Sequence, residues 1–218
     1  MHRRVSAALL SFALWAVSAF SLPLAAMAEI GFVNPSTNSA TDVSSSGGAS
    51  DVVSTDPSRL IQQGQSLENE RRWGEALTFY EDALRKFPHD PAIEQHLAST
   101  RAHYEIGRRY SDPSYKRALT TVSEREALDL YGEVLLKIQS HYVEMPDWKK
   151  LVDDSTHVYQ VALSDPVFVE HNLPRLPQAQ IDRFRREVLD RVAGWQINTR
   201  HHARDAVVYI ARLGRERL

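Results

Sequence analysis

Residues 57–90, PSRLIQQGQSLENERRWGEALTFYEDALRKFPHD, decide the fold class of this chain of 218 residues. In the first part of the stretch, Leu60, Gly64 and Leu67 recur at intervals of four and three residues. A second stripe follows a polar connection at residues 69–74 and consists of Ala76, Leu77, Tyr80, Ala83, Leu84 and Phe87. This spacing is typical of one face of an α-helix, and the segment Pro-His-Asp-Pro at 88–91 ends the second helix and starts a third. The stretch therefore predicts a helical hairpin followed by another helix.

The same residues resemble the 34-residue tetratricopeptide (TPR) repeat. Counted from Pro57, five of them lie where the TPR pattern places small, aromatic and helix-ending residues, namely Gly64, Ala76, Tyr80, Ala83 and Pro88. Gly and the first Ala allow the two helices to approach closely, Tyr fills the gap between them, the second Ala admits the next repeat, and Pro ends the helix. The chain departs from the pattern at Leu60, Gln63 and Leu67, where Trp, Leu and Tyr are common.

A second repeat is expected to be degenerate. Asp90 caps its first helix and Pro91 starts it, and its apolar stripe consists of Ile93, Leu97, Thr100 and Tyr104. The run Tyr-Ser-Asp-Pro at 110–113 interrupts the pattern before a regular second helix. Because a lone repeat cannot bury its own apolar face, the hairpin must stack on the helices that follow. Residues 58–110 are assigned to this TPR-like hairpin and third helix.

The middle segment, residues 111–173, is also predicted to be helical. Ser123 and Glu126 form a capping box, and Asp147 caps the next helix after Met145-Pro146. The predicted buried faces are Ala127, Tyr131, Val134, Leu135, Ile138 and Tyr142 on one helix, and Trp148, Leu151, Val152, Val158, Tyr159 and Leu163 on the other. Ser-Asp-Pro at 164–166 ends the second of these helices.

This middle segment carries a second resemblance, at residues 131–143 (YGEVLLKIQSHYV), 147–152 (DWKKLV) and 162–166 (ALSDP). It looks like the N-terminal helical region of the carboxyl-terminal processing, or tail-specific, peptidases. In that family a similar helix pair ends in a Leu-Asp-Pro step and leads to a PDZ domain and a serine peptidase core with a Ser–Lys dyad. Here Ser164 separates Leu163 from the Asp-Pro pair.

The residues after this pair lack the features that such a peptidase needs. They contain no Gly-rich peptide-binding loop and no strand-rich core, and the last lysine of the sequence is Lys150. A Ser–Lys mechanism needs a lysine beside an activated serine and oxyanion donors. We therefore expect no catalytic residues in this chain. It is either the front end of a truncated or split protease or a free-standing helical relative.

The N-terminal residues are expected to direct export. Residues 1–28 combine a basic start, an apolar run from Val5 to Leu24, and Ala-Met-Ala at 26–28, which is typical of a cleaved signal peptide. A retained membrane anchor is the alternative. Residues 29–57 form a Ser/Thr/Gly-rich linker that is predicted to be disordered, because it has little to bury. The mature protein is expected in the periplasm or outside the cell.

The C-terminal segment, residues 174–218, is predicted to form basic helices. Their stripes are Ile181, Phe184, Val188, Leu189 and Val192, then Ala203, Val207, Ile210, Ala211 and Leu213. The segment holds ten Arg against five acidic residues. One interpretation is proximity to a membrane surface or polyphosphate. The favoured one is a set of solvated faces on which Arg pairs with Glu187, Asp190, Asp205 and Glu216.

Composition excludes several classes of site. The chain has no Cys, which excludes disulfides, thiolate metal sites and cysteine nucleophiles. A net charge of −2 argues against a nucleic-acid partner. The nine His show no spacing of a metal site, so neither a metal nor another cofactor is expected.

The predicted function is therefore binding rather than chemistry. If the TPR resemblance holds, the groove of the array is lined by Gln65 and Asn69 of the first repeat with Gln95, Ser99 and His103 of the next, whose polar groups can bind a peptide backbone. The alternative is that this face packs against the helices of residues 123–163. We expect an all-α fold, either a short α-solenoid or a helical bundle. Its expected role is an exported module that binds a protein or peptide partner, as the accessory region of a processing protease. The alternatives are that it is part of an active Ser–Lys endopeptidase, or that it is a free-standing TPR adaptor.

Overall fold

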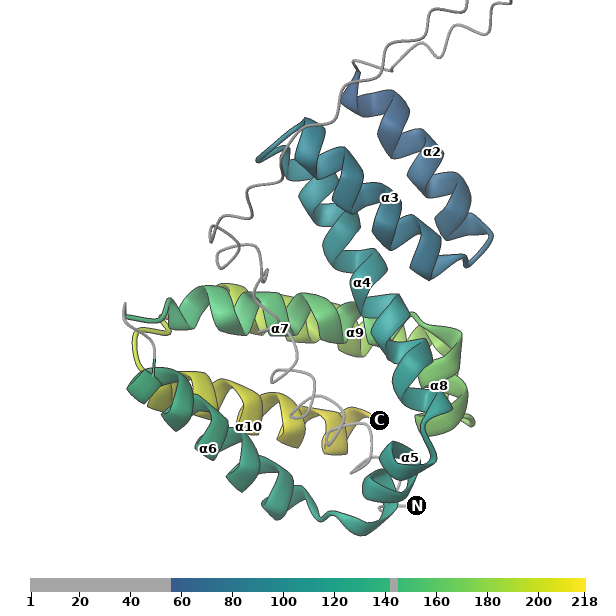
Figure 1. The fold of residues 1–218 in the computed structure, drawn as a ribbon. Coiled ribbons are helices and arrows are strands. Elements are labelled where there is room, and N and C mark those ends of the chain that lie inside the picture. The colour runs from purple at the N-terminus through teal and green to yellow at the C-terminus, as the bar shows by residue number, and fades with distance from the viewer. Residues whose placement is uncertain (1–55, 142–144) are drawn as a thin grey trace, which may run out of the picture.

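A computed structural model describes residues 56–141 and 145–218, and these residues form nine α-helices (Figure 1). Their bounds are α2 Pro57–Asn69, α3 Trp73–Lys86, α4 Pro91–Ser111, α5 Pro113–Thr121, α6 Glu124–His141, α7 Trp148–Ala162, α8 Pro166–Asn172, α9 Gln178–Ala193 and α10 Arg200–Arg217. Helices make up 82% of the described residues, which contain no strand, so the all-α prediction is confirmed. The predicted signal peptide, most of the predicted linker and Tyr142 lie outside the described residues. Within the described part of the chain, no helix is long and apolar enough to cross a membrane.

Four helices begin with the same dipeptide, Asp-Pro. In α2, α4, α5 and α8 the Asp side chain accepts hydrogen bonds from backbone N–H groups of the first turn, and Pro occupies the first helical position. Such an Asp satisfies donors that have no partner within the helix, and Pro removes one of them. The predicted cap at Asp90 is confirmed. The Asp-Pro pairs at 112–113 and 165–166 were interpreted only as interruptions, and each also starts a further helix.

The other two predicted helix starts are also confirmed. The backbone N–H of Ser123 donates to the Glu126 carboxylate at 2.7 Å, and the N–H of Glu126 donates to the Ser123 hydroxyl. The Ser123 hydroxyl also donates to the carboxylate at 2.8 Å, and the two bonds that the carboxylate accepts from Ser123 hold the pKa of Glu126 below its ordinary value. Asp147 accepts from the N–H of Lys150 at 2.9 Å at the start of α7.

A small core lies within the hairpin and the first half of α4. It consists of Leu60, Ala76, Tyr80, Ala83, Ile93 and Leu97. Gly64 lies directly against the ring of Tyr80, and any Cβ at Gly64 would overlap that ring. Four of the residues in the TPR-like pattern are therefore buried where α2, α3 and α4 meet, and Pro88 follows α3 in an exposed turn.

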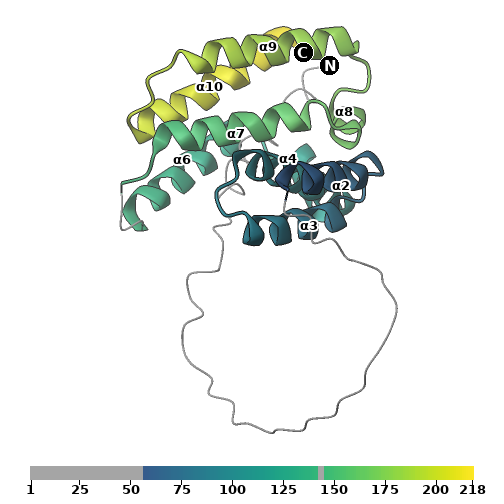
Figure 2. The ribbon, with the colours of Figure 1, turned by 90° about the horizontal axis from the view of Figure 1, so that it is seen from above.

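A larger core is formed by the remaining helices together with the second half of α4. Figure 2 shows α9 and α10 on the side of the molecule away from α2 and α3, with α7 between. The residues that were assigned to the middle and C-terminal segments share this one core. Most of the predicted stripes are buried in it, but Leu189 is 48% exposed. Leu189 was therefore wrongly assigned to the buried face of α9.

Helix α4 belongs to both cores. Ile93, Leu97 and Thr100 face the hairpin, whereas Ala102, Ile106 and Tyr110 are buried on the opposite side, in or beside the larger core. The predicted continuation of the first stripe to Tyr104 is wrong, since Tyr104 is 38% exposed. α4 therefore connects the hairpin to the other helices as one continuous rod, as Figure 1 shows.

Candidate functional site

The five predicted peptide-binding residues lie on α2 and α4 in different surroundings. Asn69 and Gln95 are exposed, and Gln65 is half-buried with its amide nitrogen 3.4 Å from Nε2 of His96. These three positions remain open to a partner. Their role in peptide binding stays a prediction.

Close to Gln65, the Glu68 carboxylate on α2 forms polar contacts with two side chains of α4. Nδ1 of His96 lies 3.1 Å from Oε1 of Glu68, and the Thr100 hydroxyl donates to the same oxygen at 2.9 Å. The ring of Tyr80 stacks on His96 with centroids 5.4 Å apart. Burial raises the pKa of the Tyr80 hydroxyl, and the Glu68 carboxylate raises it further. These contacts hold α2 against α4.

Ser99 and His103 are engaged by later helices instead. The Ser99 hydroxyl lies 3.1 Å from Nε2 of His157 on α7, and burial lowers the pKa of that imidazole. Nδ1 of His103 lies 2.6 Å from Oδ2 of Asp165, which caps α8 and is only 4% exposed. α7 and α8 both pack on α4. The partner of Ser99 lies within residues 123–163, where the alternative interpretation places the packing, whereas the partner of His103 lies just beyond them. Both side chains therefore bond to other residues of the same chain.

A groove lies elsewhere on the hairpin, between the start of α3 and the second half of α4. Its volume is about 640 Å³, and its walls include Trp73, Gly74, Tyr104 and Gly107. Trp73 is held in place because its ring stacks on His103 at 4.2 Å and 9°. A Cβ at Gly107 would meet no atom within 4 Å, so the space above this backbone is empty.

Arginines surround the groove. Arg71 and Arg72 lie in the link between α2 and α3, and Arg108 lies on α4. Arg72 pairs with Glu75 at 2.5 Å and Glu70 at 2.9 Å, and Arg108 pairs with Glu105 at 2.9 Å. These bonds lower the pKa of Glu75 and raise the pKa values of both arginines. Arg71 is exposed and has no ion-pair partner within residues 56–141 and 145–218.

This groove was not predicted from the sequence. Two signals were present in the sequence, the run Arg-Arg-Trp-Gly at 71–74 and the group Tyr104, Gly107, Arg108 and Ser111 at helical spacing. Neither signal is specific by itself. Only the packing of α3 on α4 brings the two groups to one place.

Two further hollows lie between α6 and α10. Arg204 pairs with Asp129 at 3.6 Å and Arg215 pairs with Glu124 at 3.4 Å across them. Within residues 174–218, the arginines with ion pairs are Arg185, Arg204, Arg212, Arg215 and Arg217. Of the predicted acidic partners, Glu187 and Glu216 take part in these pairs. Half of the basic charge of this segment is thus compensated within the chain.

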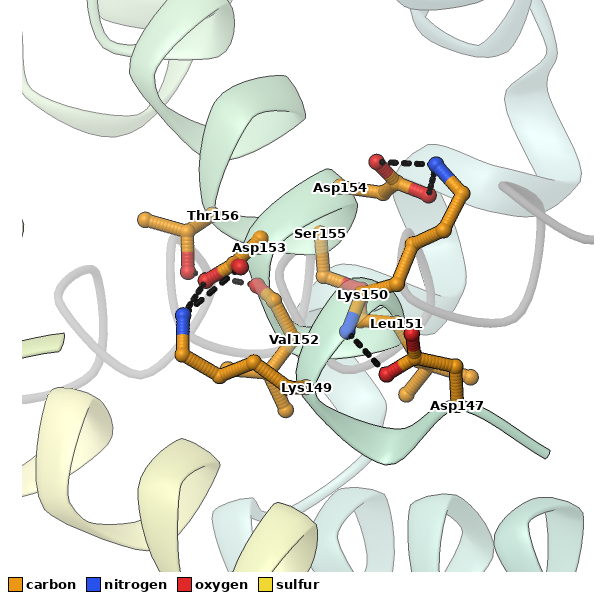
Figure 3. Close-up of polar contacts among 9 residues, drawn as sticks. All are labelled: Asp147, Lys149, Lys150, Leu151, Val152, Asp153, Asp154, Ser155 and Thr156. Atoms are coloured by element: carbon orange, nitrogen blue, oxygen red, sulfur yellow. Dashed lines mark hydrogen bonds and ion pairs between the residues drawn. The ribbon is translucent and has the colours of Figure 1, made fainter. Parts of the chain in front are cut away.

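The lysines of α7 are bound to acidic residues on the same helix (Figure 3). Lys149 pairs with Asp153 at 2.5 Å and Lys150 pairs with Asp154 at 3.1 Å. The Ser155 hydroxyl donates to the Leu151 carbonyl at 2.8 Å.

Comparisons with family models, with curated proteins and with solved structures each found no match. Among the described residues, no group of three His, Asp or Glu side chains is placed to hold a metal ion.

Proposed function

We propose that this chain is a non-catalytic helical module for protein–protein interaction, exported and attached through its N-terminal linker. The observation that carries the proposal is the groove between α3 and α4. Trp73 and Tyr104 line it, no side chain covers the backbone at Gly107, and three arginines lie around it. Aromatic residues and arginine are enriched in the parts of interfaces that contribute most to binding.

The frame around the groove supports this role. α4 is buried on opposite sides by two cores, and Trp73 is fixed by His103 and Asp165. A preordered surface loses less conformational entropy when it binds a partner. A rigid helical frame is thus suited to recognition.

The contacts of α7 support a non-catalytic role. Lys149 and Lys150 are in ion pairs, and Ser155 is hydrogen-bonded to the backbone. The middle segment that resembles the processing peptidases forms the helix pair α6 and α7, followed by α8 at the Asp-Pro step. This arrangement favours an accessory region of such a peptidase over a peptidase in its own right.

The proposal is tested by combining a cleavage assay with a capture experiment. The purified full chain is incubated with unfolded β-casein, and the products are analysed by mass spectrometry. In parallel, the tagged chain is cross-linked in its source cells, and bound proteins are identified after purification. We expect intact casein and one or a few proteins enriched with the chain. Casein cleavage that purifies with the chain would overturn the non-catalytic role, and capture of no protein would overturn the interaction role.

A further inference from the structure

The groove between α3 and α4 has room for a side chain that the protein itself does not supply. Gly74 and Gly107 both line it, and both lack side chains that would fill the space. A Cβ at Gly74 would touch only the ring of Tyr104, at 3.5 Å. A peptide can therefore approach the backbone of α4 closely at Gly107.

The aromatic walls offer an apolar contact in the same place. Tyr104 is one of the few large hydrophobic side chains that the described residues leave exposed. Trp73 cannot turn away easily, because His103 stacks on it and is itself bound to buried Asp165. An aliphatic or aromatic side chain of a partner would be desolvated against these two rings, which both line the groove.

The charge around the groove selects the partner. Its walls include three arginines and the Glu75 carboxylate, and Glu70 and Glu105 beside them also pair with Arg72 and Arg108. Arg71 is thus the wall arginine that has no ion pair among the described residues. The ion pairs of Arg72 and Arg108 are exposed to solvent, and exposed pairs contribute little free energy. A carboxylate that displaces Glu70, Glu75 or Glu105 exchanges one exposed ion pair for another at small cost. Arg71 is the arginine that gains a new pair when a carboxylate binds, so it contributes most to the preference for an acidic partner.

We infer that this groove binds an acidic segment of a partner protein, with carboxylates on Arg71, Arg72 and Arg108 and one apolar side chain between Trp73 and Tyr104. This inference rests on the proposed interaction function and names the class of partner. It places the binding surface away from the amide-lined face of α2 and α4 that the sequence predicted.

The test is an unbiased peptide selection followed by affinity measurements. Random dodecapeptides displayed on phage are selected on the immobilised full chain, and the most enriched peptide is labelled with fluorescein for anisotropy titrations. We expect selected peptides that are rich in Asp and Glu and contain an aliphatic or aromatic residue. Enrichment of neutral or basic peptides, or of none above the empty support, would overturn the inference.

Two variants with matched controls locate the binding site. Gly107→Trp fills the groove and should weaken binding of the selected peptide about tenfold or more. Gly194→Trp is its control, because a Cβ at Gly194 also meets no atom within 4 Å. Arg71→Glu should weaken binding several-fold, whereas Arg183→Glu, the same charge change on an exposed residue of α9, should have no effect. Equal effects of a variant and its control would contradict the assignment.

The same variants and assays also detect two other outcomes, namely a nucleic-acid ligand and a protein partner that binds outside the groove. A fluorescein-labelled single-stranded oligonucleotide is titrated in the same way. If it binds the chain more tightly than the peptide does, and the Arg71→Glu variant no longer binds it, the ligand of the groove is a nucleic acid and the inference of an acidic peptide is overturned. In the cross-linking experiment, Gly107→Trp should lose the captured protein. A partner that is still captured by Gly107→Trp would overturn the groove assignment while leaving the interaction function in place.

Discussion

At the scale of single residues, two glycines inside helices have opposite surroundings. Gly64 on α2 lies against the ring of Tyr80, which is fully buried and cannot move aside. Gly107 on α4 borders empty space. The first glycine is required by packing, and the second leaves a surface open.

This contrast predicts opposite effects on stability for the same substitution. Gly64→Ala forces a methyl group into the Tyr80 ring and should lower the free energy of unfolding by about 1–3 kcal/mol. Gly107→Ala should raise it by roughly 0.5–1 kcal/mol, because alanine favours the helix and meets no obstacle. Urea unfolding followed by circular dichroism measures both. Equal changes in the two variants would show that the Gly64–Tyr80 contact does not limit the approach of the helices.

The imidazole of His157 predicts a dependence of stability on pH. Burial lowers its pKa in the folded chain, so the unfolded chain binds a proton first as the pH falls. Its contribution to stability is complete above the ordinary histidine pKa and is lost as the pH falls from that value to the lowered pKa. His157→Gln, which can still bond to Ser99, should therefore show a smaller loss of stability across this range. Measurements of the urea midpoint between pH 8 and pH 5 test this, and parallel profiles for the two proteins would disprove it.

At the scale of elements, the Asp165 carboxylate has two roles. Oδ1 accepts from the N–H groups of Val167 and Phe168 at the start of α8, and Oδ2 bonds to His103 on α4. One buried side chain thus starts a short helix and attaches it to the central helix. The Asp-Pro sequence predicts an interruption at this place but not the bond to α4.

Separate substitutions distinguish the two roles of Asp165. Asp165→Ala should lower the free energy of unfolding by about 2–4 kcal/mol, from the lost cap and the lost bond to an imidazole. Asp165→Asn keeps a good capping group and should cost roughly half as much. Thermal and urea unfolding of both variants measure the difference. If Asn costs as much as Ala, the cap contributes nothing, and the bond to His103 accounts for the whole effect.

The central helix α4 shows how far helical periodicity can be extended. The stripe from Ile93 to Thr100 is buried as predicted, but its next member, Tyr104, is exposed. The reason is that α3 covers only part of α4, and the second half of α4 is buried on its other side. Periodicity identifies the faces of a helix, but it does not say where along the helix the neighbouring element changes.

At the scale of the whole molecule, the two cores are joined by one helix and by bonds around it. α4 contributes buried side chains to both, and Ser99, His103 and Tyr110 bond to α7 and α8. Separation of the cores would require α4 to lose burial on one side. We therefore expect them to unfold together.

Tryptophan fluorescence can report each core separately. A variant that retains only Trp73 reports on the hairpin, and one that retains only Trp195, which packs against the larger core, reports on the other helices. Their urea unfolding midpoints, compared with the circular dichroism of the same variant, should coincide in each case. A hairpin signal that changes at lower urea than the circular dichroism would show that the hairpin unfolds independently.

The candidate site was only partly predictable. Asn69 and Gln95 are exposed and Gln65 is half-buried, whereas Ser99 and His103 are bonded to segments 58 and 62 residues away in the sequence. The groove depends on Trp73 and Tyr104, which are separated by α3, a turn and the first part of α4. Both results depend on contacts between distant segments, which no local pattern describes.

The sequence by itself determined the helical fold class, the capped starts of α4, α6 and α7, and the close approach of α2 and α3 at Gly64. These properties depend on neighbours within a few residues, through backbone hydrogen bonds, proline geometry and the size of one side chain. Only the tertiary structure decided which faces of α4 are covered, that Asp165 and His103 meet, and where a groove remains open. Those outcomes depend on how α7 and α8 dock on α4, and the free energy of docking is a sum over many distant contacts.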